Sequence, residues 1–457
     1  MTGAGGRRRI GRALENRRSA VSHSHSHGAV VVADPDDQFW SEGDVRRRAR
    51  RSGWALIAVL LPLLVVTVAG VVALWPAGRA PAARLDFAAG GVTFPRGTIT
   101  SLTTSPCPVS DPGAVGAVPP RAPSRARVCG TAAVTIADGP DAGRSVRMDV
   151  SPDVVEAGVG AGVILLKTPE QSGSAATFSI YDVQRGRPLV AMAILMVVVA
   201  VAVARLRGLL ALVGLGFAGV VLVAFMLPAL VAGEDPLLVG LTGSAAIMFV
   251  VLYLAHGVSR RTSTALLGTF AGLALIAGLG QTAVGLAHLT GISSEDNSLL
   301  AQVATTIDMR GLLTCGIVLA GLGVLNDVTI TQASAVWELR EAAPGMPPLK
   351  LYRTAMRIGR DHIASTIYTI VFAYAGAALP VLLLIVLYGQ PLGNVLTSAD
   401  IAEELVRSMA SAIGLVLAVP LTTGLAVAVA STGGSAQAQA PTGGRRSRRR
   451  GARFSRT

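Results

Sequence analysis

The stretch that decides the fold is GLLTCGIVLAGLG (Gly311–Gly323), an apolar run that continues without a turn signal into VLNDVTITQASAVWE (Val324–Glu338). The first part has the composition of a helix buried in lipid, and the second adds Asn326, Asp327 and several hydroxyl and amide side chains to the same helix. A carboxylate in hydrocarbon costs about 3 kcal/mol by insertion scales, so Asp327 is expected to face protein or water. The stretch therefore predicts a membrane span with a polar feature inside it.

The whole chain is as apolar as this stretch requires. It has 457 residues, 51% hydrophobic and 15% charged, which is too apolar for a soluble globular protein. A spanning helix needs about 20 mainly apolar residues. Eight segments fit this length: 54–75, 189–204, 209–231, 237–256, 263–290, 311–335, 363–388 and 406–430. The predicted fold class is mainly α, a polytopic transmembrane helix bundle of about eight spans, with a small β domain described below.

The distribution of Arg and Lys predicts the orientation, because cytoplasmic flanks retain positive charge. RRRARR at 46–51 precedes the first span, and RRSRRRGARFSR occupies 445–456. With eight spans both basic segments lie inside, while the connections that carry Glu234, Asp308 and Asp400 lie outside. We therefore expect both termini to be cytoplasmic.

The net charge of +13 is mostly explained by this topology. Basic patches also bind nucleic acid, but no groove-reading helix and no basic motif studded with aromatic residues is present, so no nucleic-acid partner is expected. The Arg-rich tails are expected to contact anionic lipid head groups of the bilayer. No cofactor is expected.

Residues 1–53 and 431–457 are predicted to be disordered cytoplasmic tails on either side of an anchor span at 54–75, an extracytoplasmic domain at 76–187 and a seven-span membrane domain at 188–430. The first tail contains SHSHSHG, in which three imidazoles alternate, at His23, His25 and His27. On an extended strand these would share one side and could hold a divalent transition metal. A solvated low-complexity tail is the favoured alternative, since no Cys or carboxylate completes the ligand set.

The segment between the first two spans predicts a small antiparallel β-barrel. Five short, roughly alternating, β-branched segments are separated by Gly, Pro and Asp, at 84–94, 126–138, 144–151, 161–168 and 176–183. Cys107 and Cys129 both lie in this oxidising compartment and are expected to form a disulfide. Cys315, in the sixth span, is expected to be a core-packing residue.

Helical spacing defines the candidate transport path. Asp327, Thr331 and Ser334 share one face of the sixth span with Glu338, next to Asn326. Thr366 and Thr369 of the seventh span, and Thr422 and Thr423 of the eighth, are predicted at a similar depth and to line one cavity with them. Two alternatives remain open: Asp327 simply reaches the cytoplasmic interface, or its carboxylate bonds hydroxyls across a helix contact. The kink candidates are Pro228, Pro380 and Pro420.

Enzyme signatures are missing from the sequence. HExxH, GxSxG and the phosphate-binding GxxxxGK[ST] do not occur, and the histidines His256, His288 and His362 are scattered over different spans and sides. Asp361 is the only candidate to join Asp327 in an aspartate dyad, and a solvated helix cap explains it more simply. We expect that the protein is not an enzyme and that any transport uses a gradient or a partner.

Three blocks carry a resemblance to a known family. They are 305–339 (TTIDMRGLLTCGIVLAGLGVLNDVTITQASAVWEL), 359–384 (GRDHIASTIYTIVFAYAGAALPVLLL) and 404–424 (ELVRSMASAIGLVLAVPLTTG), with YDVQRGRPL at 181–189 before the second span. In order and spacing they resemble the YibE/F-like family of bacterial multi-span membrane proteins, over roughly residues 85–430. The resemblance implies a permease-like transporter of the bacterial cytoplasmic (plasma) membrane, with no settled substrate. The alternative is a non-transporting assembly or sensory protein whose ectodomain binds a partner.

Overall fold

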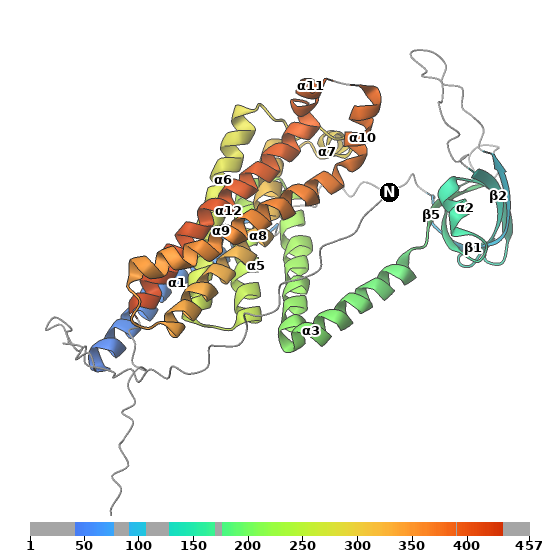
Figure 1. Cartoon of the computed structure of the whole chain (residues 1–457). Coiled ribbons are helices and arrows are strands. Elements are labelled where there is room, and N and C mark those ends of the chain that lie inside the picture. Colours follow the sequence, from blue (N-terminus) through green and yellow to red (C-terminus); the bar gives the residue numbers. More distant parts are fainter. Residues whose placement is uncertain (1–41, 77–90, 107–127, 170–175, 390, 433–457) are drawn as a thin grey trace, which may run out of the picture.

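The computed structural model describes residues 42–76, 91–106, 128–169, 176–389 and 391–432. Most of the described chain is helical, with one small sheet near the N-terminal third (Figure 1). The predicted metal ligands His23, His25 and His27 lie outside the described residues, as does Cys107. Cys129 is disulfide-bonded, and its pairing with Cys107 stays a prediction.

The segment that follows the first apolar helix forms one antiparallel sheet in the order β3-β2-β1-β4-β5. Its strands are β1 (Arg96–Pro106), β2 (Val128–Ile136), β3 (Ser145–Val150), β4 (Gly162–Thr168) and β5 (Thr177–Val183), with the short helix α2 (Pro152–Ala157) between β3 and β4. The sheet is curled so strongly that its outer strands β3 and β5 contact each other. Side chains such as Ile99, Val134 and Leu165 fill the interior.

Four of the five predicted strand segments contain a strand. Of the other, 84–94, residues 84–90 lie outside the described residues, and in its described part Thr93 forms an isolated bridge with Lys167, whereas β1 begins at Arg96. Pro95 separates the apolar segment from β1, whose own sequence, RGTITSLTTSP, is rich in Thr and Ser rather than in large apolar residues. β1 is central in the sheet and pairs with both β2 and β4.

The membrane part begins with α1 (Glu42–Ala73) and resumes after the sheet with α3 (Gly186–Val221), which is broken at Arg205 (φ 54, ψ −134). The two arms of α3 approach closely at this bend, where a Cβ on Gly208 would overlap the carbonyl oxygen of Ala200. The second arm packs on helix α5 (Pro236–His256), since Gly214 faces Val251. Figure 1 shows the two arms as a V.

The remaining helices form the bundle. After the π-helical turn η1 (Leu222–Met226) and α4 (Leu227–Val231) come α5 (Pro236–His256), α6 (Arg260–Leu286), α7 (Glu295–Val303), α8 (Met309–Ala342), α9 (Pro348–Ala377), α10 (Leu379–Tyr388), α11 (Leu392–Leu396) and α12 (Ala399–Thr432). Helices α6, α8 and α12 pack on one another as a central group, and α5 and α9 contact it from outside. Small residues allow the close approach: a Cβ on Gly414 of α12 would overlap Ile276 of α6.

Six helices of the described chain are long and apolar enough to cross a membrane, or seven if the bent pair α9 and α10 counts as one span. This count treats residues 186–231 as one span. The chain is therefore a multi-span membrane protein by the composition and length of its helices.

Candidate functional site

Helix α8 positions the candidate site. It begins at its N-cap Asp308, whose carboxylate accepts a hydrogen bond from the amide of Arg310, and runs without a break to Ala342. Because Asp327 lies about 27 Å from the first helical residue and about 22 Å from the last, it is near the middle of the helix. No turn interrupts the polar stretch, since its hydroxyls bond the helix's own carbonyls, as Thr331 does with Asp327 (2.6 Å).

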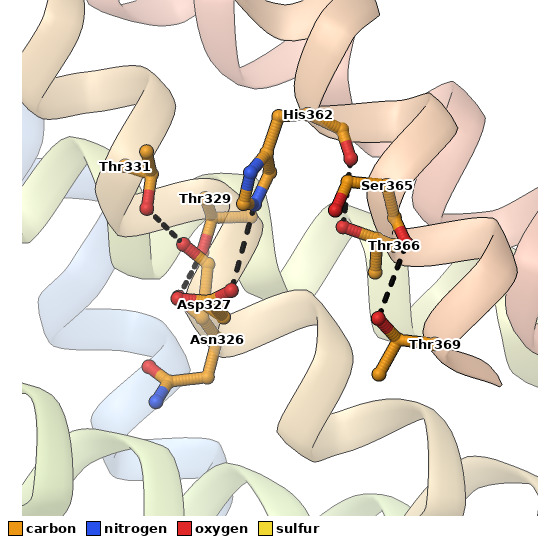
Figure 2. Close-up of polar contacts among 8 residues, drawn as sticks. All are labelled: Asn326, Asp327, Thr329, Thr331, His362, Ser365, Thr366 and Thr369. Carbon is orange, nitrogen blue, oxygen red and sulfur yellow. Dashed lines mark hydrogen bonds and ion pairs between the residues drawn. The ribbon is translucent and has the colours of Figure 1, made fainter. Parts of the chain in front are cut away.

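Asp327 pairs with a histidine of the next helix. Its Oδ2 lies 3.5 Å from Nε2 of His362 on α9, and the two side chains are 67% and 27% exposed, respectively. Figure 2 shows the imidazole of His362 reaching from α9 toward the carboxylate on α8.

The depth of this pair follows from a neighbouring helix. Thr329 of α8 hydrogen-bonds Thr269 of α6 (2.7 Å), and Thr269 lies about 13 Å along α6 from its first residue, Arg260. Asp327 is therefore about 16 Å from the level of Arg260. If Arg260 marks the membrane surface, the Asp327 carboxylate lies near the middle of a hydrocarbon layer of about 30 Å.

The outer face of α9 is also charged. The buried residues of α9 form one stripe against α8 and α12: Leu351, Ala355, Gly359 and Ile370. The opposite face carries the exposed side chains of Arg353, Arg357, Arg360 and Asp361. Asp327 and His362 lie instead where α8 meets α9, and together with Thr331 they are here called the α8–α9 face.

The structure separates the eight path candidates instead of gathering them around one cavity. Thr331 and Ser334 lie near Asp327, while Thr366 and Thr369 bond the carbonyls of His362 and Ser365 on their own helix (Figure 2). Asn326 points away from Asp327 in Figure 2, and its Oδ1 is buried without a partner among the described residues. Thr422 and Thr423 are fully buried on the other side of α8.

That other side forms a second polar group, here called the core polar layer: Thr269, Thr329, Gln332, Thr422 and Thr423, all 0% exposed. Thr423 donates to Oε1 of Gln332 (3.0 Å), and Thr269 and Thr329 share their own bond. Thr422 fits only because its neighbour on α6 is Gly268, where a Cβ would overlap the hydroxyl. On α9, a Cβ on Gly359 would come within 2.8 Å of Gln332 Nε2.

The three kink candidates differ from one another. Pro228 stands in the first turn of α4, which follows the π-helical turn η1, and Pro380 stands in the first turn of α10, where α9 and α10 meet at 63°. Pro420 lies inside α12, which continues as one helix from Ala399 to Thr432.

Two polar contacts of the structure are not predicted by the sequence. The first is that of His362, which follows Asp361 at the entry to the predicted seventh span and lies beside Asp327. The second is Glu403, close to the predicted connection that carries Asp400; it is 4% exposed and accepts bonds from the Gly291 amide (3.0 Å) and the Ser293 hydroxyl (2.7 Å). Its carboxylate joins the start of α12 to the loop after α6.

A bundle of apolar helices with an ionisable pair on one face defines a polytopic membrane protein. The model of the YibE/F-like protein family matches residues 192–432, which is more than half of the chain. The chain therefore belongs to the YibE/F-like family. No curated protein and no solved structure matches it.

Proposed function

We propose that this protein is a gradient-driven transporter of the bacterial cytoplasmic membrane, with the Asp327–His362 pair as its proton-coupling group. One observation carries the proposal: a largely exposed carboxylate stands near the middle of a helix that is long and apolar enough to cross a membrane. Such a group is costly against lipid, so the α8–α9 face borders water.

The topology that goes with this proposal has eight spans. Residues 186–231 would extend about 69 Å as one helix, more than twice the hydrocarbon thickness of about 30 Å. The break at Arg205 divides them into two crossings, which join the six others. Arg205 and Arg207 at the bend then lie on the same side as Arg260 and Arg261, in agreement with cytoplasmic basic connections. Both termini are cytoplasmic in this arrangement, and the curled sheet is extracytoplasmic.

Coupling follows from charge. Uptake of one proton changes the net charge of the Asp327–His362 pair by one unit. The net charge determines the free-energy cost of burying the α8–α9 face against lipid or another helix. The core polar layer has no ionisable member, so it stays closed through the cycle while α9 moves against α8. The solute follows the α8–α9 face, and no nucleotide is consumed.

The test replaces Asp327 by Asn, which keeps the shape and removes the charge. The matched control is Asp361→Asn, an exposed carboxylate one residue from His362. A deletion strain complemented with the wild type or with Asp361→Asn should regain the solute content of the parent strain. Asp327→Asn should insert to the same level and fail to restore it. Restored solute content with Asp327→Asn would refute the coupling role.

The assembly or sensory alternative makes a different prediction with the same strains. A protein that acts through its β domain should tolerate Asp327→Asn, because an amide preserves the helix contacts. It should fail when residues 91–183 are replaced by a linker of equal reach.

A further inference from the structure

A second feature on the opposite side of the bundle points to a lipid. A groove of about 680 Å³ lies between α1, α5 and α6. Side chains such as Leu56 and Leu64 of α1 and Phe249 of α5 make its walls apolar, while Arg260, Tyr253 and Ser263 supply polar atoms. We infer that this groove binds one anionic phospholipid, with an acyl chain along α1 and the phosphate at Arg260.

The polar atoms gather at one end. Arg260 Nε lies 4.0 Å from the position that a Cβ on Gly53 would occupy, at the mouth of the groove. The hydroxyls of Tyr253 and Ser263 share a hydrogen bond (2.9 Å), in which Arg260 takes no part. Among the described residues, no carboxylate forms an ion pair with Arg260. An unpaired guanidinium over an apolar groove is complementary to a lipid phosphate with its chain.

The level of the groove agrees with a lipid. Trp54, beside Gly53, is 70% exposed, and exposed tryptophans of spanning helices mark the head-group region. From Gly53 to Leu64 the groove follows α1 for about 16 Å, close to half of the hydrocarbon thickness. The groove therefore begins at the head groups and extends through one leaflet, as one acyl chain does.

Local charge favours an anionic over a zwitterionic lipid. Helix α6 begins with Arg260 and Arg261 and has no acidic residue in its first turn. Ser259 caps the Thr262 amide, but no acidic side chain in the turn offsets the positive potential of the N-terminal amides. A lipid with net negative charge supplies the anion that this helix start lacks. One basic residue near the membrane surface increases the affinity for an anionic lipid about fivefold.

The experiment is native mass spectrometry of the full-length protein in detergent, titrated separately with phosphatidylglycerol and phosphatidylcholine. The wild type should bind one phosphatidylglycerol about fivefold more tightly than phosphatidylcholine. Arg260→Gln should remove this preference, whereas Arg260→Lys and the adjacent control Arg261→Gln should keep it.

A groove-filling variant tests where the lipid lies. Ile57 lines the groove and is 51% exposed, so Ile57→Trp occupies the space without repacking the core. It should abolish tight binding of phosphatidylglycerol. The inference is overturned if the two lipids bind equally to the wild type or if Arg260→Gln keeps the preference. It is also overturned if Ile57→Trp leaves the binding of phosphatidylglycerol unchanged.

Discussion

The two sides of α8 use polar residues in opposite ways. Toward α6 and α12, Thr329 and Gln332 are 0% exposed and bond Thr269 and Thr423 across the helix contacts. Toward α9, Asp327 is largely exposed, with His362 as its ion-pair partner. Uncharged groups sealed in a contact hold helices together, whereas an ionisable group left open at the same depth needs water and is available for chemistry. One helix thus carries buried, uncharged polar groups on one side and an exposed, ionisable group on the other.

The largest expected effect comes from breaking the sealed side. Gly414→Ala places a methyl group on Ile276, and overpacking of this kind costs about 1–3 kcal/mol in the free energy of unfolding. Gly323→Ala, on the exposed side of α8, is the control because nothing lies within 4 Å of its Cβ. Unfolding in detergent micelles, followed by circular dichroism, measures both. Equal stability of the two variants would contradict the assignment of a closed core.

A smaller effect measures the hydroxyl pair of the core polar layer. Thr269 and Thr329 also bond the carbonyls of Ala265 and Asn326, so each keeps a local acceptor when its partner is lost. We therefore expect a coupling energy of only about 0.6 kcal/mol, typical of hydrogen bonds between membrane helices. The measurement is a double-mutant cycle with Thr269→Val and Thr329→Val. A coupling above about 2 kcal/mol would mean that this pair dominates the packing.

The smallest expected effect concerns Asp141, a carboxylate outside the membrane that can be compared with Asp327. In the β domain the hydrogen bond from Lys167 lowers the pKa of Asp141 below its ordinary value of 3.8. A lowered folded-state pKa contributes stability above the unfolded pKa, and this contribution is lost as the pH falls through the folded value. The wild type should thus unfold at a higher temperature than Lys167→Gln at pH 5, with the difference shrinking toward pH 2.

Calorimetry of the full-length protein at several pH values measures this difference. A gap between the wild type and Lys167→Gln that is constant from pH 5 to pH 2 would show that Lys167 acts through packing on Phe178 and not through Asp141.

Hydropathy was enough to predict the helices but not their pairing. The sequence predicts a connection at Arg205, where the structure has a bend, and it predicts one span over 363–388 with Pro380 as a kink candidate, where the structure has the bent pair α9 and α10. The partner of Asp327 is set by the rotation of α9 about its axis, which Gly359 fixes by packing on Gln332 and Val419. Such a contact between helices far apart in sequence leaves no periodic signal. For the same reason Thr422 and Thr423, at a suitable depth, turned out to face α6 and Gln332.

The central claim, that one side of α8 faces water and the other is sealed, is tested most directly by thiol accessibility. Asp327→Cys and Thr329→Cys place thiols two residues apart on opposite sides of the helix, and the wild type, with Cys315 only 4% exposed, gives the background. In intact membrane vesicles, a charged, membrane-impermeant maleimide should label position 327 from the cytoplasmic side and leave position 329 unlabelled. Labelling of neither position before denaturation would place Asp327 against lipid or protein and contradict the account.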